Sequence, residues 1–495
     1  MILMSIFILL ILLTIISFFL KNRPWEFSMY SSLLILALTF FYAIIIFSSG
    51  YQGNIISNYS VGLVPSIGIN FTTGASSLTL ALLFLTTMIV PIGIYISRNQ
   101  EFHGLFYGLM MLTEVGLFGL LISRNFIFFY IFWEAVIIPV FLLIAIYGGE
   151  KKETASLKFF IYTQLGSVFL LLSILTLFAF HYYYTPSHSF TLNMSSLLSS
   201  AFVSSSAIPV FWKYFIIFGF LFAFLVKMPS FPLHSWLPDA YNSAPYPVTV
   251  ILAGGLSLMG GYGFFAILLP LSSIITSSVL WIIISLGIVS LVYFSLVAMM
   301  QTNLKKMLAF ASAASMGFVN ISLGVGIMET GAFGIQELTG GIYQILAHGL
   351  IIALLFATLF LIKAKTGKEN IHSLGGIHRE VPILSSIFLG GLLASLGLPG
   401  FAGFISEFSI VAASYYVLGP LIFLVIFGMI ITASYHIWAA QRTLYGPFNE
   451  TLGRLNDIGR HDIFAIGSLL VVILILGIYP NIIFGLLEKY VEVLL

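Results

Sequence analysis

Apolar stretches long enough to cross a lipid bilayer recur along almost the whole of this sequence. A transmembrane helix needs about 20 apolar residues, because it rises ~1.5 Å per residue across a hydrocarbon core of ~30 Å. Only 7% of the 495 residues are charged, too few to cover a water-soluble surface. The sequence therefore predicts an all-α polytopic membrane protein with 14 transmembrane helices and no soluble domain. The predicted spans are centred near residues 11, 39, 86, 112, 136, 170, 218, 256, 286, 317, 348, 400, 430 and 473.

Composition also excludes several kinds of chemistry. The chain has no cysteine, so it holds no disulfide, Cys-ligated metal or iron–sulfur cluster. Its glycine-rich stretches lie inside apolar spans and follow no strand–turn–helix pattern, so no cofactor is expected on this chain. A formal net charge of +2 gives no reason to expect nucleic acid as a partner. The first 20 residues lack a basic start and a small-residue cleavage site, which predicts a retained first span.

The basic residues predict the orientation in the membrane, because Lys and Arg are enriched in the loops on the inner side. Fifteen of the 19 Lys and Arg residues fall in odd-numbered loops, for example Lys151 and Lys152. Arg124, Lys213 and Lys489 fall on the opposite side, and one more, Lys227, lies within a span. We therefore predict that odd-numbered loops face the cytoplasm or matrix and that both termini lie on the outer side.

Four ionisable side chains fall deep within predicted spans. Glu134 lies ten residues beyond Arg124, which places it ~15 Å deep, near the midplane. Glu407 lies roughly 16 Å from the outer end of span 12, and His348 is near the middle of span 11. Lys227 lies somewhat past the centre of span 7. Because a charge at the midplane costs about 2.5–3.5 kcal/mol on insertion scales, such residues indicate a functional site.

Several buried ionisable residues also have a structural interpretation. Lys227 could extend its ammonium group to the inner interface. His348 could simply bond to a neighbouring carbonyl, and Glu114, in the middle of span 4, could be a hydrogen-bonded packing residue. Glu134 cannot reach water from the midplane. Since several ionisable groups lie at comparable depth on different spans, we interpret them as a proton path.

Two of the spans are interrupted by proline and glycine. PSFP (229–232) interrupts span 7, and LGLPGFAG (396–403) interrupts span 12. The two spans are five apart, so they cross in opposite directions, which is typical of an inverted repeat of spans 4 to 8 against spans 9 to 13. Lys227 and Glu407 are then expected at matching places beside the two breaks. The predicted organisation is residues 1–100 (spans 1 to 3), 101–270 (first repeat), 271–445 (inverted second repeat) and 446–495 (last span).

A series of motifs between about residues 100 and 445 resembles the antiporter-like subunits of respiratory complex I. Within that family the resemblance is greatest to subunit M, which is subunit 4 in mitochondria, because position 407 is Glu rather than Lys. The motifs are FYIFWEAVIIPVFLLIAIYGG (129–149), KFFIYTQLGS (158–167), VKMPSFPLHSWLPDAYNSAP (226–245), VILAGG (250–255), QTNLKKMLAFAS (301–312), QILAHGL (344–350) and LPGFAGFISEF (398–408).

The resemblance implies roles for the buried ionisable residues. Glu134 and Lys227 would be a charge pair, His348 a connector and Glu407 the terminal proton-exchange group. Two positions depart from the family pattern: Leu258 replaces a usual lysine, and Ser315 replaces a frequent histidine. Water held by serine and tyrosine hydroxyls could bridge this gap, or the small residues of GGLSLMGG could form a close helix-packing face, and both interpretations stay open. Expected supporting residues are Glu114, His234, Asp239, Ser257, Tyr262, Lys306, Ser312 and Ser315.

The function implied is proton translocation in the membrane arm of a complex I-like NADH- or ferredoxin-type quinone oxidoreductase. Quinone and redox centres would lie in other subunits. Expected partners are neighbouring antiporter-like subunits, a small subunit of the K type and lipids, in a prokaryotic cell membrane or, alternatively, the mitochondrial inner membrane. Two other functions stay open: a subunit of a multi-subunit sodium/proton antiporter or membrane-bound hydrogenase, and a structural spacer whose channel is inactive.

Overall fold

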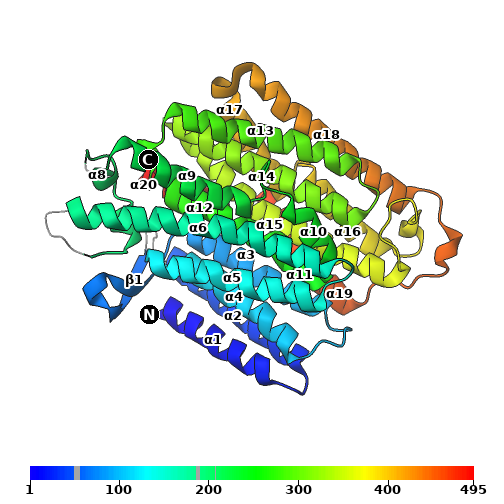
Figure 1. Cartoon of the computed structure of the whole chain (residues 1–495). Helices are drawn as coiled ribbons and strands as arrows, with labels where there is room; N and C mark the ends of the chain where they lie inside the picture. The colour runs from blue at the N-terminus through cyan, green and yellow to red at the C-terminus, as the bar shows by residue number, and fades with distance from the viewer. Residues whose placement is uncertain (49–55, 185–189, 207, 330) are drawn as a thin grey trace.

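The computed structural model describes residues 1–48, 56–184, 190–206, 208–329 and 331–495, and helices dominate throughout. The long helices lie side by side in one bundle (Figure 1). They are α1 (Ile2–Phe19), α2 (Pro24–Ser48), α3 (Ser77–Ile96), α4 (Gly104–Ile122), α5 (Phe126–Tyr147), α6 (Lys152–Tyr184), α9 (Val210–Lys227), α13 (Ser277–Met299), α14 (Leu304–Met328), α15 (Ala332–Thr366), α16 (Pro382–Ser395), α17 (Ala402–Leu418), α18 (Ile422–Ala440) and α19 (Arg460–Ile478).

Shorter elements complete the bundle. The eighth predicted span is built from α11 (Tyr246–Ile251), a π-helical turn over Leu252–Leu256, α12 (Ser257–Gly263) and a second π-helical turn over Phe264–Leu268. A third π-helical turn, Gln441–Tyr445, follows α18. The short helices are α7 (Met194–Leu197), α8 (Ser200–Val203), α10 (Trp236–Ser243), α11 (Tyr246–Ile251), α12 (Ser257–Gly263) and α20 (Asn481–Leu494).

Membrane-spanning segments account for most of the described chain. Thirteen helical stretches among the described residues are long and apolar enough to cross a membrane, and one of them, Ala402–Tyr445, runs through both α17 and α18. The polytopic all-helical prediction is therefore confirmed for the membrane part. The count of 14 crossings, the inverted repeat and the domain boundaries stay predictions.

Burial divides the helices into a central and a peripheral set. Nearly every residue of α3, α14 and α15 is buried inside the chain. Helix α6 instead carries an exposed apolar stripe with helical spacing, which in a membrane faces lipid or a neighbouring subunit. The stripe consists of Leu157, Ile161, Leu165, Val168, Leu172 and Leu175.

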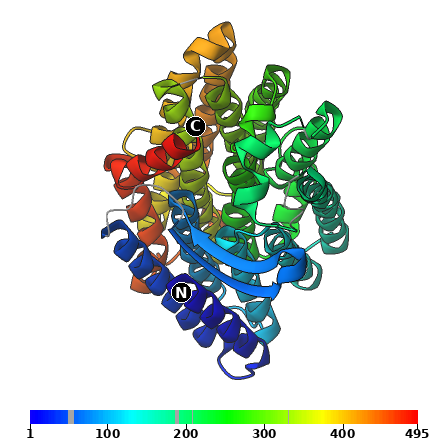
Figure 2. The same ribbon diagram turned by 90° about the vertical axis from the view of Figure 1, so that its left-hand side faces the viewer.

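One feature that the all-α prediction omitted is a β-hairpin. Strands β1 (Ile56–Val64) and β2 (Ile69–Ala75) pair antiparallel, with Val61 opposite Phe71. Figure 2 shows the hairpin across the end of the bundle where both termini lie. The segment falls between two apolar runs, so no helical periodicity constrains it, and at the end of the bundle its free edge can be hydrated.

Both predicted helix interruptions are present. Helix α9 ends at Lys227, and α10 begins only after the proline-containing segment 228–235. Helix α16 ends at Ser395 and α17 begins at Ala402, with Gly397 and Gly400 at positive φ (75° and 99°) in the break between them. Proline removes a backbone donor and glycine tolerates left-handed backbone, so these residues end the helices where they occur.

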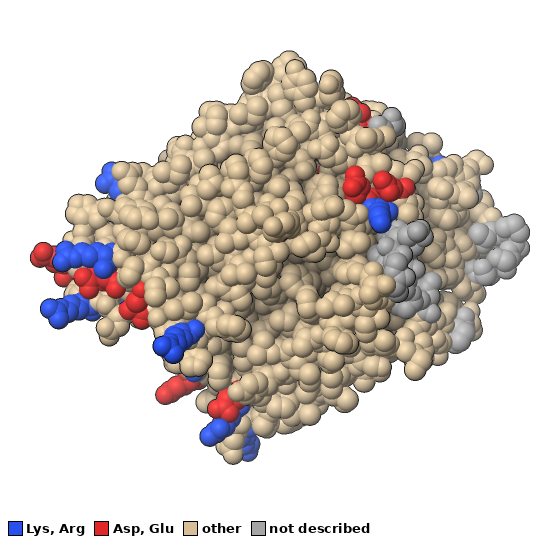
Figure 3. All heavy atoms as spheres, turned by 180° about the vertical axis from the view of Figure 1, so that it is seen from behind, with Lys and Arg blue, Asp and Glu red and all other residues tan. Residues whose placement is uncertain are grey.

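Charge is distributed unevenly between the two ends of the bundle. On the face shown in Figure 3, Lys and Arg side chains gather mainly at one end. Figure 1 places both chain termini at the opposite end. An even number of crossings puts both termini on the same side, as the orientation predicted from the loops requires.

Candidate functional site

Lys227 is the last residue of α9 and lies inside the bundle, at the first helix break. Its side chain is only 1% exposed, so it does not extend to the membrane surface. Its Nζ has no hydrogen-bond partner among the described residues. The ammonium group lies 5.5 Å from the ring centroid of Trp133 and 5.9 Å from that of Phe159. Aromatic faces stabilise a cation weakly, so the ammonium group is stabilised here without being held by a strong bond.

Glu134 follows Trp133 in α5 and lies near Lys227 without touching it. The carboxylate interacts with Lys227 electrostatically. The ion pairs within 4.0 Å among the described residues do not include these two, however, so the direct pair expected from the sequence is open in this structure. One carboxylate oxygen of Glu134 is buried and finds no hydrogen-bond donor among the residues that the structure describes. The two groups can therefore influence each other's charge without a bond to break.

His348 lies in the centre of α15 and is held between two serines of α14. Its Nε2 lies 3.1 Å from Ser312 Oγ, and its Nδ1 lies 2.7 Å from Ser315 Oγ. Ser315 Oγ also donates to the Ser312 carbonyl at 3.0 Å, so it accepts from Nδ1–H while Ser312 Oγ donates to Nε2. Ser315, which stands where the family often has histidine, is thus in direct contact with the histidine of the neighbouring helix.

Hydrogen bonds continue from His348 towards Glu407. The side-chain amide of Gln344 donates to the Ser315 carbonyl at 3.4 Å and accepts from the hydroxyl of Ser406. Ser406 precedes Glu407 in α17. Sequence reasoning missed Gln344 and Ser406; the available signal was that Gln344 stands four residues before His348, on the same helix face.

Glu407 lies one and a half turns beyond the start of α17, beside the second break. Its side chain is buried, with 6% exposed. A Cβ on Gly397 would lie 2.5 Å from Glu407 Oε2, so the carboxylate rests against the glycine in the break. Lys227 precedes its break while Glu407 follows its own. The two residues are therefore beside the breaks as expected, but from opposite sides of them.

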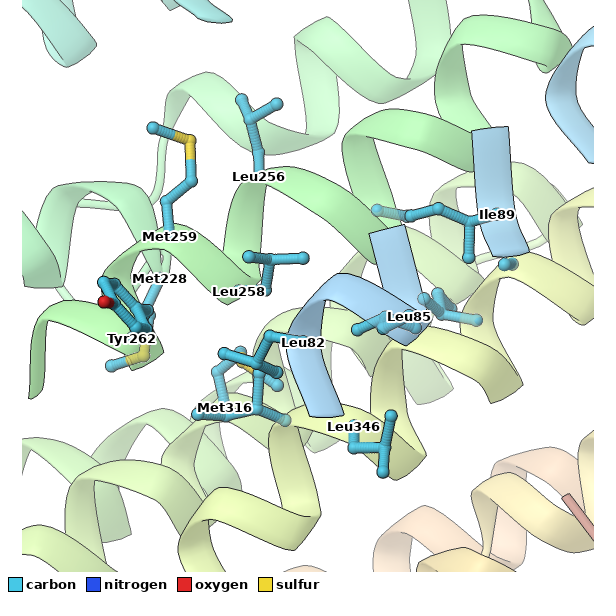
Figure 4. Close-up of a cluster of buried hydrophobic side chains, with 14 of the residues drawn as sticks. Leu82, Leu85, Ile89, Met228, Leu256, Leu258, Met259, Tyr262, Met316 and Leu346 are labelled. Carbon is cyan, nitrogen blue, oxygen red and sulfur yellow. The ribbon is translucent and has the colours of Figure 1, made fainter. Parts of the chain in front are cut away.

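Leu258, where the family has lysine, lies in apolar surroundings. Figure 4 shows it within a cluster of buried side chains that includes Leu82, Met228 and Met316. The hydroxyl of Ser257 bonds back to the carbonyl of Ala253 in its own helix at 2.8 Å. Of the two interpretations of GGLSLMGG, the close helix-packing face is the one that this packing favours.

Tyr262 stands one helical turn after Leu258 and belongs to the same buried cluster (Figure 4). Its hydroxyl donates to the Leu121 carbonyl at 3.1 Å and accepts from Arg124 Nη1 at 3.1 Å. Arg124 also donates to Thr79 Oγ1 at 2.7 Å. Tyr262 is thus part of a polar cluster at the predicted outer end and is not in contact with Ser312 or Ser315.

The remaining expected residues are dispersed. Asp239 forms an ion pair with Lys158 at 2.6 Å, and His234 stacks among aromatic rings, 4.6 Å from the centroid of Phe294. Lys306 is exposed. Its neighbour Lys305 is buried instead, and its ammonium group donates to two carbonyls at the end of α10. Sequence reasoning did not single out Lys305.

Glu114 is completely buried in α4 and accepts a hydrogen bond from Ser32 Oγ of α2 at 3.2 Å. Its other carboxylate oxygen has no partner among the described residues. The contact joins the peripheral helix α2 to the largely buried helix α4, which agrees with a packing role. Within the described ranges, no group of three or more His, Cys, Asp or Glu residues could hold a metal ion.

Two interrupted membrane helices with a buried lysine and a buried glutamate beside their breaks, and a histidine network between helices, define an antiporter-like membrane protein. The family model described as NADH:quinone oxidoreductase/Mrp antiporter, TM, matches residues 123–432, which include both breaks. The chain belongs to this family, and the resemblance to complex I subunit M expected from the motifs is confirmed.

Relatives match along nearly the whole chain. F(420)H(2) dehydrogenase subunit M of Methanosarcina mazei is 33% identical over 480 residues, 95% of this chain and 93% of the relative. NADH-quinone oxidoreductase subunit M of Rickettsia felis is 33% identical over 474 residues, 94% of this chain and 92% of the relative. Respiratory complex I from Thermus thermophilus with bound NADH contains a chain of the same fold, with a TM-score of 0.87, 24% identity and complete coverage of both chains (100% each).

Proposed function

We propose that this chain is a proton-translocating, subunit M-type component of the membrane arm of a complex I-like quinone oxidoreductase. The observation that carries the proposal is the hydrogen-bonded series from His348 through Ser315 and Gln344 to Ser406, which ends beside Glu407. Hydroxyl, amide and imidazole groups in contact can align water and pass a proton between ionisable ends. The chain itself would carry no redox centre and would respond to redox chemistry elsewhere in the assembly.

The Glu134–Lys227 site supplies the control step in this proposal. Lys227 has no hydrogen-bond acceptor in the described part of the chain, so its positive charge depends on the carboxylate of Glu134 and on two aromatic rings. When Glu134 is neutralised or attracted elsewhere, Lys227 loses that support and gives its proton to water that enters the helix break. When the carboxylate returns, Lys227 takes up a proton again. Glu134 is partly exposed on α5, where a neighbouring subunit can reach it.

The partners and location follow from the same proposal. Other membrane-arm subunits, including further antiporter-like subunits and a small K-type subunit, would cover the exposed apolar faces together with lipid. The assembly would lie in a prokaryotic cell membrane, with both termini of this chain on the outer side. The electron donor is a property of other subunits.

The packing around Leu258 favours a second candidate. Apolar side chains separate the Lys227 site from the His348 network at the place where the family usually has lysine. If no proton crosses this region, the chain would be a structural spacer that transmits changes in charge without carrying protons.

One experiment separates the two candidates. The complete complex, carrying Glu407→Gln or His348→Leu in this chain, is reconstituted into liposomes, and quinone reduction and proton translocation are recorded together. If this chain translocates protons, both substitutions are expected to lower the number of protons moved per electron while the subunits still assemble. Ser173→Ala, a buried serine on the α6–α9 contact, is the control and should leave the ratio unchanged. An unchanged ratio in both variants would favour the spacer.

A further inference from the structure

A second buried carboxyl lies on the same helix pair as Glu407. Glu337 belongs to the second turn of α15, ~7.5 Å from the helix start at Ala332, and is completely buried. Its Oε1 accepts a hydrogen bond from Ser414 Oγ of α17 at 2.9 Å. Its Oε2 is buried and has no partner among the described residues. No described Lys, Arg or His forms an ion pair with it.

The contacts between α15 and α17 place Glu337 and Glu407 along one line. Gln344 meets Ser406, and a Cβ on Gly340 would lie 3.1 Å from Ser409 Cβ. About one helical turn further along α15, Glu337 contacts Ser414. Glu407 and Ser414 are seven residues apart, so they lie on the same face of α17, separated by two turns or ~10.5 Å. Polar side chains therefore follow this interface from the His348 network towards the end of the bundle at Ala332.

The line reaches the surface of the chain through Glu329. Glu329 follows the last residue of α14 and is partly exposed. Its backbone carbonyl lies against Gly334, one turn before Glu337, and its charge acts on Glu337. This end of α15 is the side predicted to be outer. A buried carboxyl with an unpartnered oxygen is thus placed between Glu407 and a carboxyl that water can reach.

We propose that Glu337 is the proton-release group of this chain, between Glu407 and the outer side. Glu407 loses one proton and Glu337 gains it, and Glu337 then gives the proton to water beside Glu329. Hydroxyls of Ser409 and Ser414 line the interval and can hold the water that a transfer over two helical turns needs. This inference rests on the proposed function, because it gives Glu407 a proton to release.

The test uses the complete complex in liposomes, with quinone reduction and proton translocation measured together. Glu337→Gln keeps the shape of the side chain and an oxygen that accepts from Ser414, so assembly should be retained. It should lower the protons moved per electron to the level of Glu407→Gln. Glu337→Asp keeps a carboxyl but shortens its reach by one methylene, so it should restore most of the ratio with slower transfer and a larger solvent deuterium isotope effect. Ser173→Ala is again the control.

The outcomes separate the two proposals. If Glu407→Gln lowers the ratio and Glu337→Gln leaves it unchanged, the release role is overturned and the proposed function stands. If neither variant changes the ratio, the proposed function itself fails. If Glu337→Gln does not assemble, Glu337→Asp decides: a normal ratio with an unchanged isotope effect overturns the role of Glu337, because a structural carboxyl has no effect on proton transfer.

Discussion

At the scale of single residues, the proposed control step depends on the weak interactions that hold the ammonium group of Lys227. A buried lysine that donates to several carbonyls, as Lys305 does to those of Asn242 and Ala244, is held in one position by those bonds. Lys227 has two aromatic rings and a carboxylate at a distance instead. The two lysines are similarly buried and differ in their partners, and this difference is the reason that we propose proton exchange for Lys227.

Glu134→Gln is the sharpest test of this control step. The substitution removes the charge that supports Lys227 but breaks no ion pair, so we expect the complex to assemble while proton translocation by this chain falls sharply. Lys227→Arg keeps the positive charge but should not support full proton translocation, because a guanidinium group does not readily release its proton. Protons moved per electron are measured in liposomes, with Lys213→Gln at the opposite end of α9 as control. Normal translocation in Glu134→Gln would contradict the control step.

At the scale of elements, one carboxylate ties three helices together at the end of α15. Glu369 accepts hydrogen bonds from Tyr246 at 2.7 Å, from Asn303 at 3.0 Å and from Lys363 at 2.8 Å. These residues belong to the start of α11, the cap of α14 and the last turn of α15. Burial alone would raise the pKa of Glu369, but the bonds from Lys363, Tyr246 and Asn303 outweigh it and lower the pKa to about 2.

The stability of this junction should therefore depend on pH. Because the pKa of Glu369 in the fold is below its ordinary value of 4.5, the ionised group stabilises the fold above about pH 4.5. That contribution is lost as the pH falls towards about 2. Glu369→Gln should lower the unfolding free energy near pH 7 by about 1–3 kcal/mol, with a smaller difference at pH 3. Thermal unfolding in detergent measures it, with the exposed Glu450→Gln as control. An equal difference at both pH values would rule out an ionised Glu369 as the cause.

At the scale of the whole molecule, the orientation can be tested directly because the chain has no native cysteine. Lys152 begins α6, and Ser195 follows the far end of that helix, whose 33 residues span ~50 Å. We expect Lys152→Cys to react with an impermeant thiol reagent from the cytoplasmic or matrix side and Ser195→Cys from the outer side. Reaction of both from one side would show that the count of crossings is wrong. The unmodified chain is the control for background labelling.

Apolar runs and proline or glycine placement were enough to predict the helical membrane fold and both helix breaks. These properties are local, because a run of apolar residues must be helical in lipid and a proline ends its own helix. The hairpin of β1 and β2 was not predicted, since its strands are stabilised by pairing with each other and not by a periodic apolar pattern. The sequence also placed Lys227, His348 and Glu407 within apolar spans, and all three side chains are buried in the structure; their depth in the membrane stays a prediction.

The hydrogen-bond partners of side chains on neighbouring helices could not be predicted from the sequence. Depth along one helix does not specify which neighbour a side chain meets, because that depends on how each helix is rotated and packed. Only the packing of α14 against α15 brings Ser312 and Ser315 to His348, and only the packing of α15 against α17 joins Gln344 to Ser406 and Glu337 to Ser414. The sequence by itself determined a bundle of membrane helices with buried charges. The tertiary structure decided which of those charges are connected, because hydrogen bonds form only between side chains that the packing brings within reach.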